Sequence, residues 1–114
     1  MSQKIVLLAL TATAAGAVSA HRFVGYDGAQ VDTAGAKALG VSVSDAVDGD
    51  DLAVDVIGTT VVETGGAFSA GDDLVADASG RAIVNPEVGG EVVQAHALDD
   101  AGGAGEFIEV LLVR

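Results

Sequence analysis

Two histidines are the side chains of this sequence best suited to binding a transition metal. His21 and His96 are the only histidines, and imidazole nitrogen is a good ligand for copper. His21 follows an apolar run that ends in "VSA", as a signal-peptide cleavage site would. Cleavage there would free an amino group beside the His21 ring, and the two could bind copper with His96. This interpretation predicts a small exported copper-binding protein.

The same stretch can instead be the opening strand of the fold. The run "IVLLALTATAAGAVSA" is preceded by a single Lys, whereas signal peptides normally begin with more positive charge. His96 lies in "VQAHAL", whose alternation is typical of a β-strand. We therefore predict a structural first strand, two ordinary strand histidines, and no metal or other cofactor.

Aspartates gather in three short groups that could attract Ca²⁺, which prefers several oxygen ligands. None of the groups follows the Asp-x-Asp-x-Asp-Gly spacing that ends in Glu at position twelve. We interpret them as solvated acidic turns. The groups are Asp48, Asp50 and Asp51; Asp72 and Asp73; and Asp99 and Asp100.

The composition indicates one small domain, residues 1–114, with a thin core. Apolar residues make up 50% of the chain, but aromatic residues only 4%. Such a domain often gains stability by burying surface on a partner. Seventeen acidic and five basic residues give a net charge of -12, which disfavours nucleic acid and anionic membranes as partners. The chain has no cysteine, so disulfides and thiolate sites are excluded.

Short Val-rich segments separated by Asp-Gly turns predict an all-β domain, a small β-barrel or β-sandwich-like fold. "TAGAKALG" is expected to form a helical turn or an extended loop. Phe23 and Phe107 lie in apolar strands, so we expect both to be buried. The expected strands are IVLLALTA, SAHRFVGY, LGVSVSDA, DLAVDVIGTTVVET, DLVAD, EVVQAHAL and EFIEVLLVR.

The two halves of the sequence resemble each other, which predicts an internal duplication with a repeat of roughly fifty residues. "GAVSA" at 16–20 matches "GAFSA" at 66–70, and small insertions then align Phe23-Val24 with Leu74-Val75 and Gly28 with Gly80. "SDAVDGDDLAV" at 44–54 resembles "DDAGGAGEFIE" at 99–109. Because the second "SA" lies in mid-chain, the duplication favours a structural role for the first.

The ordered pattern of short motifs resembles the DUF2190-like family, the capsid cement or decoration proteins of tailed bacteriophages. The resemblance covers the chain from about Leu8 onward, and the order and spacing of the motifs are more specific than any one of them. The motifs are Arg22-Phe23-Val24, Ala38 to Val41, Asp50 to Gly58, Ala67 to Gly71, Ser79 to Ala82 and Gly105 to Val110.

This resemblance implies a non-enzymatic β-rich protein that binds the outer surface of the mature capsid as a homotrimer. Its expected partner is the major capsid protein, whose lattice it would stabilise at threefold or quasi-threefold positions against the pressure of packaged DNA. It would be made in the host cytoplasm and assembled into the virion. The resemblance also implies an N-terminal arm over residues 1–8 whose lattice contacts are Ser2, Gln3, Lys4, Ile5, Val6, Leu7 and Leu8.

Two other functions remain open from the residues alone. One is the exported copper-binding protein described above, with His21 and His96 as ligands. The other is a non-viral β module for adhesion or scaffolding, which the composition permits. Trimerisation together with binding to empty capsid shells would separate the decoration protein from both.

Overall fold

The computed structural model describes residues 4–113, and in this range the chain forms strands, turns and loops without a helix. The all-β prediction is thus confirmed. Among these residues there is also no helix of the length and apolar character that crossing a membrane requires. The strands are β1 (Val6–Thr13), β2 (Phe23–Val24), β3 (Gly40–Ser42), β4 (Asp51–Glu63), β5 (Asp73–Ala76), β6 (Ala82–Val84), β7 (Ala95–Ala97) and β8 (Phe107–Leu112).

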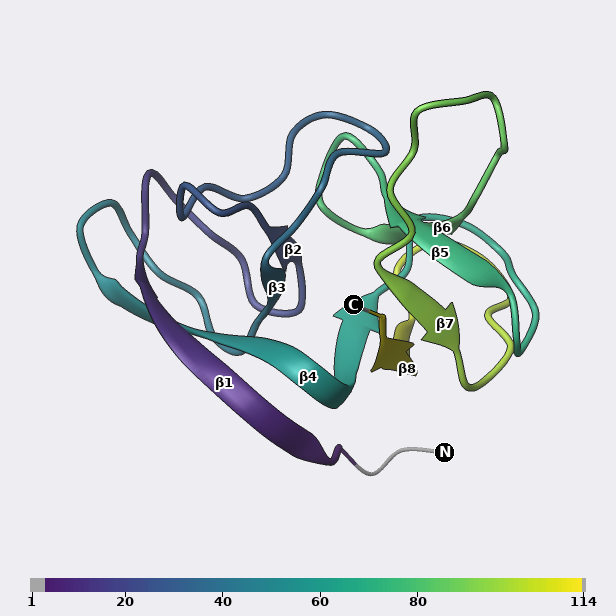
Figure 1. The fold of residues 1–114 in the computed structure, drawn as a ribbon, viewed down its shortest axis with the longest axis horizontal. Coiled ribbons are helices and arrows are strands. Elements are labelled where there is room, and N and C mark those ends of the chain that lie inside the picture. The colour runs from purple at the N-terminus through teal and green to yellow at the C-terminus, as the bar shows by residue number, and fades with distance from the viewer. Residues whose placement is uncertain (1–3, 114) are drawn as a thin grey trace.

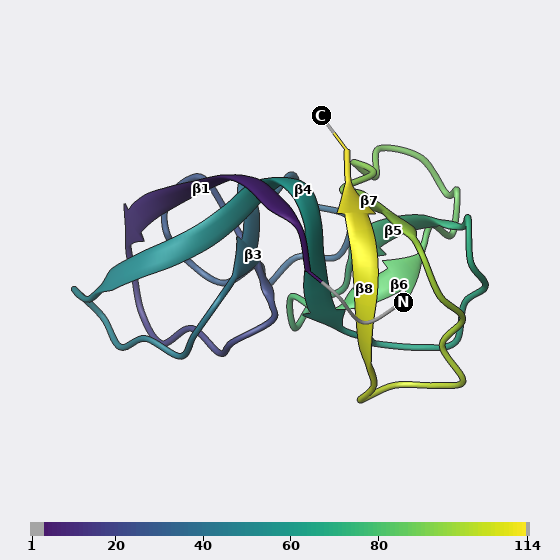
Figure 2. The same cartoon turned by 90° about the horizontal axis from the view of Figure 1, so that it is seen from below.

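The eight strands form one antiparallel sheet whose long central strand, β4, belongs to two lobes. The strand order is β2-β3-β4-β8-β7-β5-β6, and β1 also pairs with β4. The first part of β4 lies between β1 and β3, and its second part pairs with β8. Figure 1 shows β4 running along β1 and then bending away from it, and Figure 2 shows β8 beside β4. We call residues 4–58 the first lobe and residues 59–113 the second lobe.

Gly58 lies at the bend of β4, where the strand leaves β1. Its φ is +107°, which is readily accessible to glycine and strained for other residues. A Cβ atom there would collide with the backbone oxygen of Ile5. The register between β1 and β4 also shifts on both sides of Leu8, so the ladder is irregular at the bend. Glycine therefore permits one strand to serve both lobes.

The predicted duplication is confirmed by hydrogen bonds that recur in the two lobes. In each lobe an alanine N–H donates to an aspartate Oδ1 at 2.8 Å, and an isolated bridge lies two residues before it. The strand pairs also correspond, because β1–β4 in the first lobe is matched by β4–β8 in the second. The matched contacts are Ala20–Asp45 with Ala70–Asp100, and Val18–Ala46 with Phe68–Ala101.

The strand register corrects the sequence alignment of the two lobes by one residue. Phe23 pairs with Val41 between β2 and β3, and the corresponding pair between β5 and β7 is Asp73 with His96. Phe23 is thus the counterpart of Asp73 and not of Leu74. The extra residues of the second lobe lie between this pair and the following turn, where Gly28 and Gly80 correspond as expected.

Two apolar clusters form the core, and the first lobe contributes to both. The larger cluster contains second-lobe residues such as Val62 and Val110 together with Phe23 and Val41 of the first lobe. The smaller cluster contains Val24 and its first-lobe neighbours. Since adjacent residues of a strand point to opposite faces, β2 sends Phe23 into one cluster and Val24 into the other. The two lobes are therefore joined by a shared core as well as by β4.

The remaining strand predictions were right in place; IVLLALTA has the length of β1 and begins one residue before it, and the others were too long. SAHRFVGY contains only β2, and EVVQAHAL only β7, while "TAGAKALG" forms a turn followed by an extended segment that leads into β3. The strand β6 was missed, because its three residues follow the DASGR turn without a pattern of their own.

Candidate partner-binding surface

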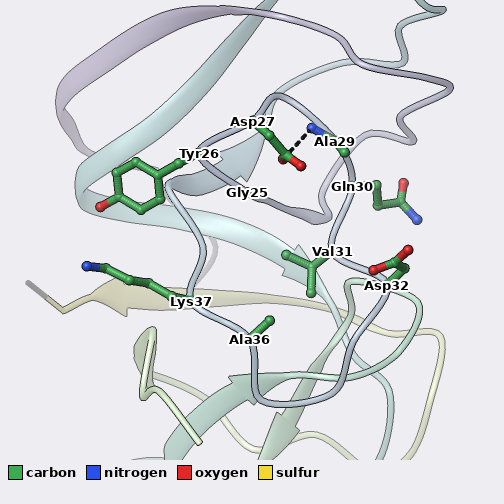
Figure 3. Close-up of a pocket in the computed structure, with 9 residues that line it drawn as sticks. All are labelled: Gly25, Tyr26, Asp27, Ala29, Gln30, Val31, Asp32, Ala36 and Lys37. Atoms are coloured by element: carbon green, nitrogen blue, oxygen red, sulfur yellow. Dashed lines mark hydrogen bonds between the residues drawn. The ribbon is translucent and has the colours of Figure 1, made fainter.

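One pocket, of about 390 Å³, lies in the loop between β2 and β3. Figure 3 shows Tyr26 and Lys37 side by side at its rim, with the Lys37 ammonium 5.4 Å from the ring centroid. The Asp27 carboxylate accepts a hydrogen bond from the N–H of Ala29 at 3.0 Å, so it holds its own turn. Val31 and Ala36 also line it, Val31 buried and Ala36 partly buried. The lining residues do not bring a nucleophile next to a base, and the pocket is best described as a loop surface.

The acidic turns use their carboxylates to bind backbone N–H groups. Asp48 accepts from Gly16 at 3.0 Å, and Asp72 accepts from Ser69 at 2.9 Å. Asp77 accepts from both Ser79 and Arg81 at 2.8 Å. Such side chains stabilise turns by satisfying donors that the turn leaves free. In residues 4–113 no group of three or more His, Asp or Glu side chains could hold a metal ion.

The two histidines have separate partners. His21 Nδ1 lies 3.2 Å from the backbone oxygen of Val61, and its ring meets that of Phe107 edge-on with the centroids 5.5 Å apart. His96 Nε2 lies 3.2 Å from Asp73 Oδ1, across the β5–β7 pair. His21 joins the two lobes, and His96 forms a cross-strand pair. Neither contact favours the copper interpretation.

The predicted lattice contacts at the N-terminus lie against β4. Lys4 Nζ forms an ion pair with Asp55 Oδ2 at 2.8 Å, and that carboxylate, which is buried, also accepts a hydrogen bond from Thr60 Oγ1 at 2.7 Å. Ile5 donates to Thr59 Oγ1 at 2.8 Å and accepts from the Thr59 N–H at 2.7 Å. Val6, Leu7 and Leu8 belong to β1 itself. Ser2 and Gln3 lie outside the described residues.

An apolar stripe runs along β1 and is open to solvent. Leu7 is 74% exposed and Ile5 58%, and Leu8 and Leu10 each keep more than two fifths of their surface exposed. β1 pairs with β4 on one edge only, and within residues 4–113 its outer edge has no ladder partner. An open edge with apolar side chains is a place where another chain can add a strand. We call Ile5, Leu7, Leu8 and Leu10 the β1 stripe.

A second apolar surface lies on the outward side of β8. Phe107, Glu109 and Leu111 alternate along the strand and so point to the same side, away from the core residues Ile108, Val110 and Leu112. Phe107 is 58% and Leu111 42% exposed, so the expectation that Phe107 is buried was wrong. Glu109 is paired with Val61 on β4, and its backbone oxygen accepts from Leu98. The β8 face consists of Val61, Leu98, Phe107, Glu109 and Leu111.

Sequence reasoning missed the β8 face although a signal was present. The segment "FIEVLL" alternates, and both of its faces carry apolar residues. Such a strand is expected to be covered on both sides, and one of the two covers is then another element of the fold or another molecule. Phe107 was assigned to the core because the face toward the core could not be chosen from this pattern alone.

Comparisons with known proteins match this chain to a protein family and to a solved structure. A family model described as phage cement protein matches residues 2–112. A solved structure, the N base of the head fiber gp8.5 of bacteriophage phi29, superposes with a TM-score of 0.72 and 22% sequence identity, over 93% of each chain. At that identity the likeness concerns the fold. A search of the curated proteins found no match.

Proposed function

Since this chain belongs to the phage cement protein family, we propose that it decorates the outer surface of a mature phage capsid and strengthens its lattice. In this proposal the protein is a homotrimer that binds the major capsid protein at threefold or quasi-threefold positions. It carries out no chemical reaction there. It is made in the host cytoplasm and joins the virion when the capsid has expanded.

The observation that carries the proposal is the β1 stripe, in a chain of this family. Three exposed leucines stand on a strand whose outer edge is unpaired within residues 4–113, and the exposed Ile5 immediately precedes it; the predicted contacts Ile5, Leu7 and Leu8 are among these four residues. Apolar patches of this kind on small soluble proteins generally mark binding sites. Strand addition at the β1 edge would supply backbone hydrogen bonds, and the leucines would bury apolar area on the partner.

Lattice stabilisation follows from mass action. A protein that binds the expanded capsid and not the unexpanded form lowers the free energy of the expanded state by its own binding energy. A trimer touches several capsid subunits at once, so contacts that are weak singly become strong together. The role therefore needs exposed surface and rigidity more than reactive groups.

The test begins with native mass spectrometry of the purified protein, which should give a trimer. Capsid shells that lack the protein are then mixed with it, sedimented, and heated. We expect saturable binding and a higher temperature of shell disruption. A matched variant, Leu7→Ser with Leu10→Ser, should stay folded because both side chains are exposed, and should bind more weakly.

Two results would contradict the proposal. Wild-type protein that stays in the supernatant with expanded shells would exclude capsid decoration. A monomer that nevertheless binds shells would exclude the trimer and leave decoration in place.

Because the chain carries a net charge of -12, we also expect binding to weaken as salt rises, as for an acidic surface on a basic patch.

A further inference from the structure

Glu109, at the centre of the β8 face, is a buried carboxylate that lacks a full set of partners. The residue is only 4% exposed, and its Oε1 atom has no hydrogen-bond donor among residues 4–113. A carboxylate held away from water without partners costs free energy, and native proteins rarely keep one without a reason. Its position therefore calls for an explanation outside the described contacts.

The residues beside Glu109 on the β8 face are apolar, and two of them are exposed to solvent. Val61 on β4 and Leu98, the residue that follows β7, flank it, while Phe107 and Leu111 precede and follow it on the same side of β8. Phe107 and Leu111 are 58% and 42% exposed. An exposed apolar rim around a single buried charged group is the arrangement of a binding hot spot, in which the rim excludes water from the central contact.

The duplicate position in the first lobe shows that the fold itself does not require this carboxylate. The pair Val61–Glu109 of the second lobe corresponds to Thr11–Ala53 of the first. Ala53 is exposed and Thr11 is exposed, so this part of the first lobe has neither the charge nor the apolar rim. The same ladder thus forms without a glutamate, and the face is special to the second lobe.

We propose that Glu109 is the receptor for a lysine or arginine side chain of the major capsid protein, which docks on the β8 face. This inference rests on the proposed capsid role and names one contact within it. Because Oε1 is buried in the free chain, the Glu109 side chain would turn outward to accept from the partner's cation, while the aliphatic stem of that cation would lie on Phe107 and Leu111. The β8 face is then a second capsid contact, beside the β1 stripe.

The charges of this chain indicate that the cation comes from a different protein. There are five basic residues, and the four in the described range already have partners: Lys4 with Asp55, Arg22 with Glu63, Arg81 with Asp77, and Lys37 with the ring of Tyr26. The fifth, Arg114, lies outside that range. A second copy of this acidic chain is a poor source of lysine or arginine, whereas a basic capsid surface matches its charge.

The experiment measures two properties of Glu109→Gln, with Glu87→Gln as the matched control. Glu87 is exposed in the loop between β6 and β7, and its replacement makes the same change of charge. For Glu109→Gln we expect binding to expanded shells to weaken at least about thirtyfold, because a buried charge pair is lost. The thermal unfolding midpoint of the free protein should stay the same or rise, since an unpaired buried charge is removed. Glu87→Gln should change neither.

Glu109→Leu tests the same contact with a second variant, in which no polar side chain remains at position 109. Leucine suits the apolar surroundings, so the free protein should be at least as stable as wild type and should bind shells as weakly as Glu109→Gln. Unchanged shell affinity in either variant would overturn the inference and leave the capsid role intact. A clear loss of stability in free Glu109→Gln would assign the carboxylate to a partner within this chain, which also overturns it. Failure of the wild type to bind would instead contradict the proposed function.

Discussion

The two lobes share one hydrogen-bond frame and differ on their outward faces. The pairs Thr13–Asp51 and Glu63–Phe107 occupy corresponding places in the two ladders. In the first lobe this place holds a polar, exposed pair, and in the second an exposed aromatic ring that contacts His21. The ladder and the turns constrain backbone atoms and buried side chains only. Outward positions are therefore free to differ between the lobes.

A second difference concerns the pairs Phe23–Val41 and Asp73–His96. The first pair is fully buried in the shared core, whereas in the second the His96 Nε2 and Asp73 Oδ1 atoms lie 3.2 Å apart and both side chains are about half exposed. One lobe is therefore covered by its neighbour in the chain, and the corresponding face of the other lobe is made for water.

Phe23→Ala should cause the largest loss of stability in the molecule. Phe23 is fully buried in the core that both lobes share, and its removal leaves a cavity at their junction. We expect a loss of about 3–5 kcal/mol in the free energy of unfolding. The loss can be measured by urea unfolding monitored by far-UV circular dichroism, since the chain has no tryptophan whose fluorescence could be used.

The control is Phe107→Ala, which removes a phenylalanine ring from the surface instead of from the core. Because Phe107 is 58% exposed, its loss should cost no more than about 1 kcal/mol. Equal losses at the two sites would show that Phe107 is covered in the protein in solution, and the contrast between core and docking face would fail.

Gly58→Ala should cause the next largest loss of stability, because it alters the bend of β4, the strand that both lobes share. The residue keeps a φ of +107°, and the added methyl group meets the backbone of Ile5. We expect a loss of about 2–3 kcal/mol. Gly49→Ala has a similar φ of +88° with open space around the new atom, so it should lose about 1 kcal/mol. If the two variants were equally stable, the bend of β4 would tolerate a side chain.

Val110→Ala and Val54→Ala compare the two cores directly. Both valines are fully buried at corresponding places in β8 and β4. Val110 lies in the larger cluster, where more neighbours hold the cavity open, and its variant should lose about 2 kcal/mol. Val54→Ala, in the smaller cluster, should lose about 1 kcal/mol. The reverse order, measured by denaturant unfolding, would show that the first lobe is the more rigid one.

Lys4→Met should have an effect as small as those of the control variants above. It leaves the buried Asp55 carboxylate with Thr60 alone, but Lys4 is 34% exposed, so water already screens part of the pair. We expect a loss of about 1 kcal/mol. The counterpart of Asp55 in the second lobe is Leu111, which needs no cation. A loss that persists unchanged in concentrated salt would show that Lys4 acts by packing and not by charge.

The turns and the duplication could be predicted from the sequence because they depend on local residue types. "GAVSA" and "GAFSA" form equivalent bridges in the two lobes. In each lobe an aspartate later in the repeat accepts a hydrogen bond from the N–H of the last alanine of this motif. The all-β class follows from the same kind of local signal. These features need no knowledge of which distant residues meet.

The candidate partner-binding surface was harder to predict because it depends on which face is left uncovered. Phe23 and Phe107 have similar apolar neighbours in the sequence, and only the three-dimensional register buries one and exposes the other. The predicted N-terminal contacts Ile5, Leu7 and Leu8 are exposed, whereas Glu109 was not singled out. A buried acid between apolar residues of an alternating strand carries little information until its neighbours are known.

The shared core also sets an order for synthesis of the protein. Chains emerge from the ribosome N-terminus first, so β1 to β4 are available before β8 exists. During that interval Phe23 and Val41 have no second lobe to pack against, and the half-made protein presents an apolar face to solvent. Such a nascent lobe is prone to aggregate with other incomplete chains. Fast translation through residues 64–113 shortens the time during which its apolar face is exposed. Codon choice in this half of the gene is therefore expected to bear on yield.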